Sequence, residues 1–411
     1  MRILFLTGIS IVLMLSACKR DMPNEKPILD FLYTADALTV TISGTAMDND
    51  GNIKSMIVEW GDSLAETLVL NETGYVEKSH HYSAPGNYTI VITATDNSNE
   101  SSTQTFITDL KFNITSLDGI KSGIFKSSAK EFLVLTLNLH TYQEKNQEEK
   151  INLIIDAIGL MDVDFVLFEE CAQLKTAPIV EGIIREDNMA LIISKGVAAK
   201  YGVEYSFVWD WSHYGFDNWE EGVVVLSKHP LINTDSRYIS TNTSKMSITS
   251  RKTIYGSYGF SATERLNMFD AHTHWRLTET DEEQNNQVKK LKLMVDEKEQ
   301  MVNGSKVMTL IGCDLNGNPT SDYPWSEGYN TMVANNKYVD SYLKIYPDAN
   351  TKPSLSIYNT VEGDFPGRID YIFMKENPYL EIKDSQIIFT NHVIGLVSDH
   401  YGVITKFRII D

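Results

Sequence analysis

The feature that most constrains the fold is a change in the spacing of apolar residues near position 130. From Ile28 to about Leu110, apolar and polar residues alternate in short runs that end at turn sequences, and no helical period occurs. Alternation with a period of two is typical of half-buried β-strands. After Glu131, strand-like apolar runs are separated by segments with a helical period. The chain therefore divides into an all-β part and an α/β part.

We expect a polar linker between these two parts. Residues 109–130 contain Gly119, Gly123 and several serines and lysines. The chain has 411 residues, which is more than one ordinary domain needs. The pattern predicts a β-sandwich over residues 27–110 and an α/β domain over residues 128–411.

Helical periods and apolar runs alternate in the second part. Ile151, Ile154 and Ile158 share one face of a predicted helix, and Val288 and Leu291 belong to another. The predicted strands are Phe132–Leu137, Phe165–Phe168, Met189–Ile193, Val223–Leu226, Leu266–Asp270, Val307–Ile311, Ile369–Phe373 and Val403–Phe407. This alternation predicts stacked β-sheets flanked by helices.

The N-terminus has the pattern of a secretory signal. A positively charged start precedes an apolar run from Ile3 to Leu15, which is short for a membrane span. Leu15-Ser16-Ala17-Cys18 resembles a bacterial lipobox, which implies cleavage before Cys18 and lipidation of that residue. The alternative is a plain signal peptide with Ala17 at its cleavage site. Because Lys19 rather than Asp follows, the resemblance implies a protein anchored at the bacterial outer membrane or cell surface.

The charge balance limits the class of substrate. The chain has 36 Lys and Arg residues against 55 Asp and Glu residues, a formal net charge of -19. Because neutralisation of phosphates supplies most non-specific affinity for long nucleic acids, this balance argues against a processive DNA-binding protein. It leaves open a nuclease with a locally basic cleft.

Two further cysteines, Cys171 and Cys313, lie within apolar runs. A disulfide between them is one interpretation, because exported proteins can form disulfides. We favour two buried free thiols that behave as small apolar side chains.

Polar residues stand at the ends of several predicted strands. Asn138 ends one apolar run, and Glu169 and Glu170 end the next. Because side chains alternate along a strand, one of these glutamates can enter a cleft while the other is solvated. A carboxylate at the carboxyl end of a strand is well placed to hold magnesium. Plain strand termination is the alternative interpretation.

Two histidines, His272 and His274, are predicted to share one face of an extended segment. A zinc pair is the competing interpretation, but no cysteine or further close histidine completes it. We therefore expect one imidazole to contact a phosphate group and the other to be its neighbour.

The remaining candidate residues suit proton transfer at a phosphate ester. Asp314 and Asn316 follow a predicted strand, where the carboxylate can fix a water molecule and the amide can steady the phosphate, although such residues also occur in inert turns. Asp370 lies between apolar residues and needs a partner, and a histidine would be a suitable one. Together with Asp399, this set matches metal-assisted attack of water on phosphorus.

Six ordered motifs resemble the endonuclease/exonuclease/phosphatase superfamily. They are Leu135-Thr136-Leu137-Asn138, Phe168-Glu169-Glu170, Thr273-His274, Gly312-Cys313-Asp314-Leu315-Asn316, Arg368-Ile369-Asp370-Tyr371 and Ser398-Asp399-His400. Two of them depart from the usual Thr-Trp-Asn and Gln-Glu of the family, and neither departure removes an expected ligand. The resemblance implies a four-layer α/β sandwich.

The same resemblance implies a role for each site residue. It implies a metal shell of Asn138, Glu170 and Asp399, which would hold Mg²⁺, with Mn²⁺ or Ca²⁺ as alternatives. It implies that His400 is the general base or acid, that Asp370 orients it, that Asp314 and Asn316 position water and phosphate, and that His274 stabilises charge on phosphorus.

The N-terminal part resembles the PKD (polycystic kidney disease) domain, an immunoglobulin-like β-sandwich. The resemblance rests on Asp48-Asn49-Asp50-Gly51, Trp60-Gly61-Asp62, Pro85-Gly86-Asn87-Tyr88 and Ala94-Thr95-Asp96-Asn97. Such domains mostly act as spacers or weak adhesion modules.

An aromatic segment from Tyr205 to Trp219 is the candidate for substrate recognition. Its Trp211 and Trp219 could stack on a ring or rest on lipid at the mouth of a cleft. The alternative is that these aromatic residues form a corner of the hydrophobic core. Separately, Arg251 is a candidate phosphate contact.

These expectations combine into one leading function and two alternatives. We expect a monomeric, membrane-anchored phosphodiesterase that uses a metal ion to hydrolyse a small or lipid-linked phosphodiester. One alternative is an extracellular nuclease, for which nucleic acid is a substrate only. The other is a catalytically idle adhesion or glycan-binding lipoprotein.

Overall fold

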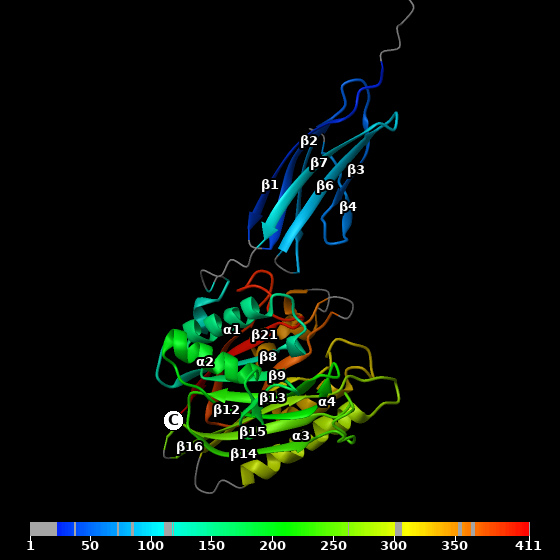
Figure 1. The fold of residues 1–411 in the computed structure, drawn as a ribbon. Coiled ribbons are helices and arrows are strands. Elements are labelled where there is room, and N and C mark those ends of the chain that lie inside the picture. Colours follow the sequence, from blue (N-terminus) through cyan, green and yellow to red (C-terminus); the bar gives the residue numbers. More distant parts are fainter. Residues whose placement is uncertain are drawn as a thin grey trace, which may run out of the picture. The chain divides into compact units, whose positions relative to one another are not determined.

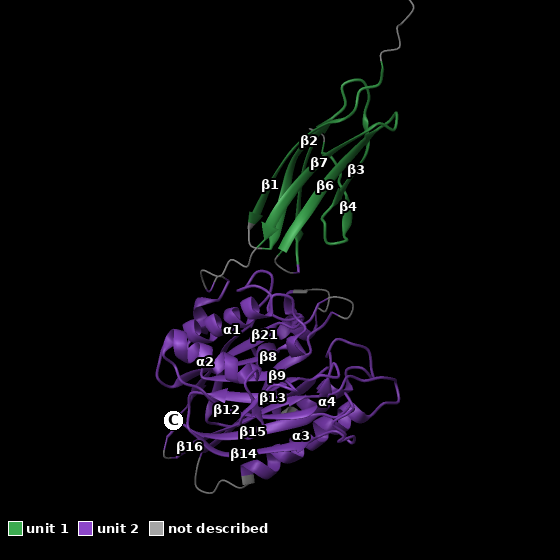
Figure 2. Cartoon of the chain, in the orientation of Figure 1, with its two compact units in different colours: residues 1–82, 86–110 green, residues 83–85, 111–411 purple. Residues whose placement is uncertain are grey.

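The computed structural model describes residues 23–410, except for 37, 72–73, 84–85, 111–116, 118, 262, 301–305, 352–355 and 363–365. The chain divides into unit 1, Met1–Tyr82 with Gly86–Leu110, and unit 2, Ser83–Pro85 with Lys111–Asp411 (Figure 2). The predicted signal segment and Cys18 lie outside the described residues. In the part of the chain that is described, no helix has the length and apolarity needed to cross a bilayer.

Unit 1 consists of two antiparallel sheets (Figure 1). One has the order β1 (Ile28–Asp36), β2 (Thr39–Met47) and β5 (Tyr75–His81); the other has the order β4 (Ala65–Thr67), β3 (Ile53–Glu59), β6 (Gly86–Asp96) and β7 (Ser101–Leu110). Alternate residues such as Val40 and Ile42 in β2 and Ile90 and Ile92 in β6 are fully buried, which agrees with the expected period of two. The immunoglobulin-like assignment stays a prediction.

Unit 2 contains two six-stranded mixed sheets. The first has the order β12 (Ser206–Gly215), β13 (Trp219–Ser227), β9 (Phe165–Leu174), β8 (Glu131–Asn138), β21 (Gly402–Ile409) and β20 (Leu380–Ile388). The second has the order β14 (Leu231–Tyr238), β15 (Lys252–Gly259), β16 (Glu264–His272), β17 (Lys306–Asp314), β19 (Asp370–Lys375) and β18 (Tyr338–Asp340). The pairs β8–β9 and β16–β17 are parallel, so the carboxyl ends within each pair lie side by side.

The two sheets pack face to face, and helices cover their outer faces. Val134, Leu167 and Leu310 belong to the apolar core between the sheets. Helices α1 (Gln147–Met161) and α2 (Met189–Tyr201) pack on the first sheet. Helices α3 (Glu283–Gln300) and α4 (Glu327–Val333) pack on the second sheet. A short helix, α5, spans Ser341–Ile345. Because strands far exceed helices, unit 2 fits the predicted four-layer α/β sandwich only loosely. The minor hairpin is β10 (Ile179–Glu181) with β11 (Ile184–Arg185).

One predicted strand is wrong, because residues 189–193 begin helix α2. The side chain of Asn188 accepts a hydrogen bond from the Leu191 N–H and so caps this helix. Met189, Ile193 and Val197 are buried at helical spacing. A short apolar run is ambiguous by itself, and here the cap and the residues after the run decide in favour of a helix.

The aromatic segment from Tyr205 to Trp219 is mostly strand and forms β12 and the start of β13. Trp209 is buried and its indole N–H donates to the carbonyl of Cys171. The core-corner alternative therefore describes this segment better, because strand pairing holds its aromatic side chains against the sheet.

The predicted linker is shorter than expected at its C-terminal end. Ile124 is fully buried in the core that α1 and α2 share with the first sheet. The backbone N–H of Lys121 donates to Gln386, whose side-chain amide donates to the carbonyl of Gly119. These contacts make residues 119–124 part of unit 2.

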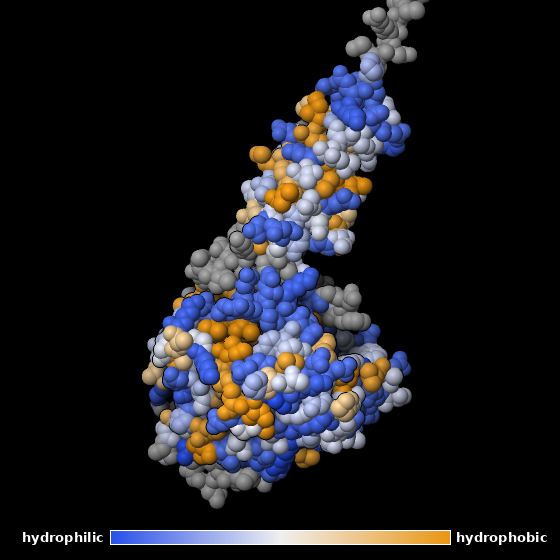
Figure 3. Space-filling model, viewed as in Figure 1, coloured by the Kyte–Doolittle hydropathy of each residue, from blue (hydrophilic) through white to orange (hydrophobic). Residues whose placement is uncertain are grey.

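The two cysteines of unit 2 are buried free thiols, as expected. The surface of the unit is mostly hydrophilic on the face drawn in Figure 3, with apolar areas between the polar ones.

Candidate active site

A buried imidazole–carboxylate pair lies where two strands begin. Asp370 opens β19, and His400 lies just before β21. The Nδ1 atom of His400 is 3.0 Å from each carboxylate oxygen of Asp370. Burial lowers the pKa of His400, but the negative charges of Asp370 and Asp314 outweigh it and raise that pKa well above its usual value. These negative charges favour the protonated imidazolium form of His400.

Asp314, the last residue of β17, faces this imidazole. Its Oδ2 atom lies 3.9 Å from His400 Nε2 and accepts a 2.9 Å hydrogen bond from Asn138 Nδ2. Its other oxygen accepts from the backbone N–H of Asn316 at 2.9 Å. Burial raises the pKa of Asp314 to about 7, although the charge of His400 opposes that shift. A carboxylate with a pKa near neutrality is suited to accept and release a proton.

Glu170 and Glu169 have different partners: Glu170 contacts Asn138, whereas Glu169 contacts Thr136. Asn138 Nδ2 donates to Glu170 Oε1 at 3.0 Å. Glu170 has a positive φ of 47°, an unusual conformation for a glutamate within a strand. Glu169 is not solvated, as was expected of one of the two glutamates, but fully buried, and it accepts a hydrogen bond from Thr136. The expectation failed because both faces of β9 are covered.

A second carboxylate, Glu221, lies beside Glu170. It accepts hydrogen bonds from Thr141 at 2.7 Å and lies 3.1 Å from His213 Nε2. Burial raises the pKa of Glu170, and the negative charge of Glu221 raises it further. A cation bound beside Glu170 and Glu221 would reduce the repulsion between their carboxylates. The sequence did not single out Glu221, because it lies within an apolar strand rather than at its end.

The structure brings His272, rather than His274, to the carboxylates. His272 Nε2 lies 3.4 Å from Asp314 Oδ2 and accepts a 3.1 Å hydrogen bond from Asn316 Nδ2. The ring of His274 is buried, and neither of its nitrogens has a hydrogen-bond partner among the residues that the structure describes. Burial and the charge of Arg251 lower the pKa of His274 to about 4. At neutral pH this residue can offer a neutral imidazole and not a positive charge.

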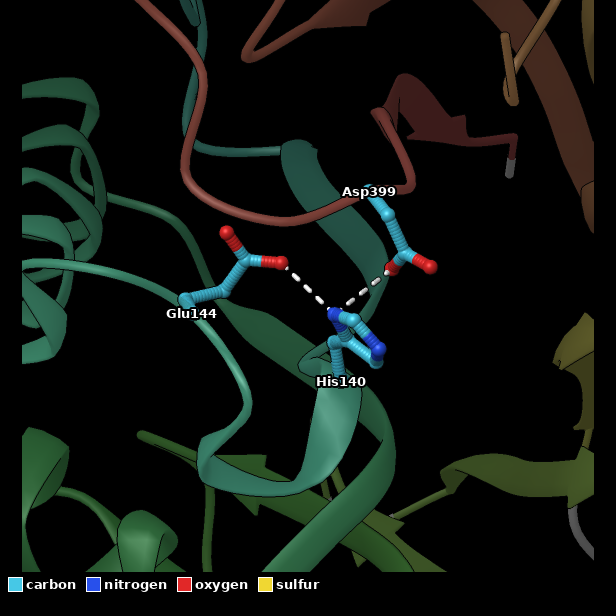
Figure 4. A group of neighbouring side chains, drawn as sticks. All are labelled: His140, Glu144 and Asp399. Atoms are coloured by element: carbon cyan, nitrogen blue, oxygen red, sulfur yellow. Dashed lines mark hydrogen bonds and ion pairs between the residues drawn. The ribbon is translucent and has the colours of Figure 1, made fainter. Parts of the chain in front are cut away.

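Three groups of side chains among the described residues could hold a metal ion: Glu170, Glu221 and His272; Asp314, Asp370 and His400; and His140, Glu144 and Asp399. The predicted ligand Asp399 belongs to the last group, where its Oδ1 lies 3.4 Å from His140 Nδ1 (Figure 4). The predicted ligands Asn138 and Glu170 contact each other in the interior. Carboxylate and amide oxygens suit a hard divalent cation, so these residue types fit the expected metal. The Asn138 nitrogen faces Glu170 and its oxygen accepts from the His140 N–H, so the amide would have to turn over for its oxygen to bind an ion beside Glu170.

The predicted substrate contacts are less accessible than expected. Arg251 is buried and its Nη1 atom lies 3.4 Å from Glu221 Oε1. Trp219 stacks on Tyr142 with ring centroids 4.6 Å apart, and Lys245 Nζ lies 3.2 Å from the ring centroid of Trp211. All three residues therefore have internal partners.

A cavity of about 870 Å³ adjoins the site instead. Its lining includes Asn316, Trp275 and Trp325. The two tryptophans are about 40% exposed, at 40% and 39%. Trp275 closely follows the end of β16, which is a sequence signal, whereas Trp325 lies far beyond the end of β17 and has none.

No protein-family model matches the sequence, and no curated protein matches it. Solved structures are similar in fold. An endonuclease/exonuclease/phosphatase family protein from Leptotrichia buccalis C-1013-b matches 68% of this chain and 100% of its own, with 23% identity and a TM-score of 0.57. The human Nocturnin catalytic domain with bound sulfate anion matches 68% of this chain and 95% of its own, with 16% identity and a TM-score of 0.50.

The similarity establishes the fold of unit 2 as that of endonuclease/exonuclease/phosphatase structures. The PKD1 domain of Vibrio anguillarum Epp matches 22% of this chain and 98% of its own, with 25% identity and a TM-score of 0.19. The PKD assignment of unit 1 therefore stays a prediction.

Proposed function

We propose that unit 2 is a metal-dependent phosphoester hydrolase, and more narrowly a phosphodiesterase that acts on a small or lipid-linked phosphodiester. The observation that carries this proposal is the Asp370–His400 pair, whose second ring nitrogen faces Asp314 at 3.9 Å. The adjoining oxygen ligands, Asn138 and Glu170, complete the inventory that hydrolysis of a phosphate ester needs. The fold supports the same reaction class.

The metal ion would be held by Asn138, Glu170 and Asp399. When bound, it would neutralise charge on the phosphoryl oxygens of the substrate. No ion pair between Glu170 and a lysine or arginine is found among the described residues, so a cation would also relieve its repulsion with Glu221.

The protein residues would move the protons. The oxygen of a water molecule attacks phosphorus, and Asp314 takes one of its protons. The bond between phosphorus and the leaving oxygen breaks, and His400 Nε2 donates its proton to that oxygen. The proton on Asp314 then returns to His400, which lies 3.9 Å away. Asp370 holds the imidazole in place through Nδ1.

The narrower substrate class follows from charge and anchoring. A net charge of -19 disfavours long polyanions. We also propose that Cys18 carries a lipid anchor at the bacterial outer membrane or cell surface, which would place unit 2 near lipid headgroups. Radiolabelled palmitate should be incorporated into the wild-type chain and not into Cys18→Ser.

Activity assays with purified protein test the function. Sphingomyelin, DNA and inositol phosphates are each incubated with Mg²⁺, Mn²⁺ or Ca²⁺, with EDTA as a control. We expect chelator-sensitive cleavage of a small or lipid-linked phosphodiester. Turnover of DNA alone would favour the nuclease alternative. If no phosphoester is cleaved with any of these metals, unit 2 is not a hydrolase.

A further inference from the structure

A second cluster of ligand atoms lies at the surface beside the proposed reaction centre. Its three side chains come from separate segments: His140 from the turn after β8, Glu144 from the loop before α1, and Asp399 from the loop before β21 (Figure 4). His140 Nδ1 lies 2.6 Å from Glu144 Oε1 and 3.4 Å from Asp399 Oδ1. One imidazole nitrogen therefore faces two carboxylates.

The surrounding contacts hold these side chains in place. The backbone N–H of His140 donates to Asn138 Oδ1 at 2.9 Å, which ties the turn to the interior of the site. The buried Lys150 forms an ion pair with the second oxygen of Glu144. Because Lys150 occupies that oxygen, the first oxygen remains directed at the imidazole. The cluster is thus arranged by groups that are not part of it.

The cluster is open to ions. The side chain of Asp399 is 49% exposed and that of His140 is 28% exposed. Two carboxylates face the imidazole, and Lys150 balances only one of them. Ligands of a tetrahedral ion with bonds of 2.0–2.1 Å lie about 3.4 Å apart, close to the distance between His140 Nδ1 and Asp399 Oδ1. The closer Glu144 would have to retreat by roughly 1 Å when an ion replaces the shared proton.

We propose that His140 Nδ1, Glu144 Oε1 and Asp399 Oδ1 bind a first-row transition metal ion, Zn²⁺ or Mn²⁺, in preference to Mg²⁺. Imidazole nitrogen suits Zn²⁺, whereas Mg²⁺ prefers oxygen ligands in octahedral geometry. The inference rests on the proposed function only in that Asp399 is expected to serve both sites.

Metal binding by the full chain, measured without any substrate, tests the proposal. Protein stripped with a chelator is titrated with Zn²⁺ or Mn²⁺ in competition with a chromophoric chelator, and with Mg²⁺ by calorimetry. The variant is His140→Asn, because asparagine tolerates the positive φ of 52° at this position. The matched control is His392→Asn, at an exposed position of the same unit.

We expect His140→Asn to weaken Zn²⁺ binding by at least about tenfold and Mg²⁺ binding by less than about twofold. The visible absorption of bound Co²⁺ should change in this variant and not in the control. Glu144→Gln should weaken Zn²⁺ binding in the same direction. Equal Zn²⁺ affinities and Co²⁺ spectra in wild type and His140→Asn, with unchanged circular dichroism, would overturn the proposal.

The outcome is independent of hydrolysis. If the chain binds Zn²⁺ through His140 but cleaves no phosphoester, the proposed function fails and the metal site stands. If it cleaves a phosphoester and His140→Asn leaves metal binding unchanged, the metal site fails alone.

Discussion

Two of the buried imidazole–carboxylate pairs in the described part of unit 2, His400 with Asp370 and His213 with Glu221, differ in what the second ring nitrogen contacts. In the pair of His400 and Asp370, Nδ1 is bound and Nε2 faces Asp314 at 3.9 Å, beyond hydrogen-bond distance. In the pair of His213 and Glu221, Nε2 faces the carboxylate and Nδ1 contacts Ser212 and the carbonyl of Ser250. A histidine can transfer a proton to substrate only when one ring nitrogen is left for it. The first pair meets this condition and the second does not.

The carboxylates around the two pairs have opposite pKa shifts. Burial would raise the pKa of Glu221, but His213 and Arg251 lower it to about 2. Asp314 is equally buried, and the charge of His400 only partly offsets burial, so its pKa rises to about 7. The comparison leads us to expect a structural role for His213 and Glu221 and, if the proposed function holds, a catalytic role for His400 and Asp370.

The largest effect is expected for His400→Asn. We predict that kcat falls about 10³-fold, because the proton donor to the leaving oxygen is lost. The free energy of unfolding should fall as well, because His400 and Asp370 form a buried ion pair. Steady-state hydrolysis and urea unfolding measure the two quantities. Retention of wild-type kcat would contradict a catalytic role for this pair.

The matched change in the other pair is His213→Ala. We predict a loss of about 3 kcal/mol in the free energy of unfolding, because a buried ion pair is broken. The kcat of the folded fraction should remain within about tenfold of wild type. A loss of kcat equal to that of His400→Asn, at unchanged stability, would remove the distinction between the pairs.

Asp370→Asn tests the orienting carboxylate. We predict a fall in kcat of about 10²-fold, because the imidazole loses the partner that fixes its tautomer. The pKa of His400 should also fall, since the negative charge of Asp370 is one of the causes that raise it. Proton NMR of the imidazole follows that pKa, and an unchanged value would show that Asp370 does not control His400.

The dependence of stability on pH should differ in sign between the two carboxylates. For Asp314, the ordinary pKa of 3.8 rises to about 7, so its contribution to stability is complete below 3.8 and is lost as the pH rises through 7. Asp314→Asn should therefore be more stable than wild type at pH 8, by roughly 2 kcal/mol.

For Glu221, the ordinary pKa of 4.5 falls to about 2, so its contribution is present above 4.5 and is lost toward pH 2. Glu221→Gln should be less stable than wild type at pH 6, and the difference should vanish near pH 2. Urea unfolding in the presence of EDTA at several pH values measures both trends. Parallel trends in the two variants would contradict the opposite shifts.

Much of the fold could be predicted from apolar spacing. The apolar runs at residues 132–137 and 307–311 form the central strands β8 and β17, and the helical periods near 151–158 and 288–295 form α1 and α3. The run at residues 189–193 was misassigned because five apolar residues fit a strand and a buried helix equally well. The strands β14 and β15 were not anticipated.

The residue types of the candidate site could also be predicted from the sequence. Asn138, Asp314 and Asp370 stand at strand ends, where polar side chains collect at one edge of a sheet. The contact between Asp370 and His400 is present in the structure. The place of Glu221 could not be predicted, because it depends on pairing between β13 and β9.

By itself, the sequence determined which chemical groups are available and near which strand ends they lie. Only the tertiary structure decided which of them meet. Strand β16 ends at His272, and Thr273 donates hydrogen bonds to the backbone carbonyls of Asp314 and Leu315. Because the strand has ended, the alternation of side chains along it no longer places His274 on the same face as His272. The pKa values were decided in the same way. Burial and the charges of residues distant in the sequence determine these pKa values, and neither can be predicted from the spacing of residues along the chain.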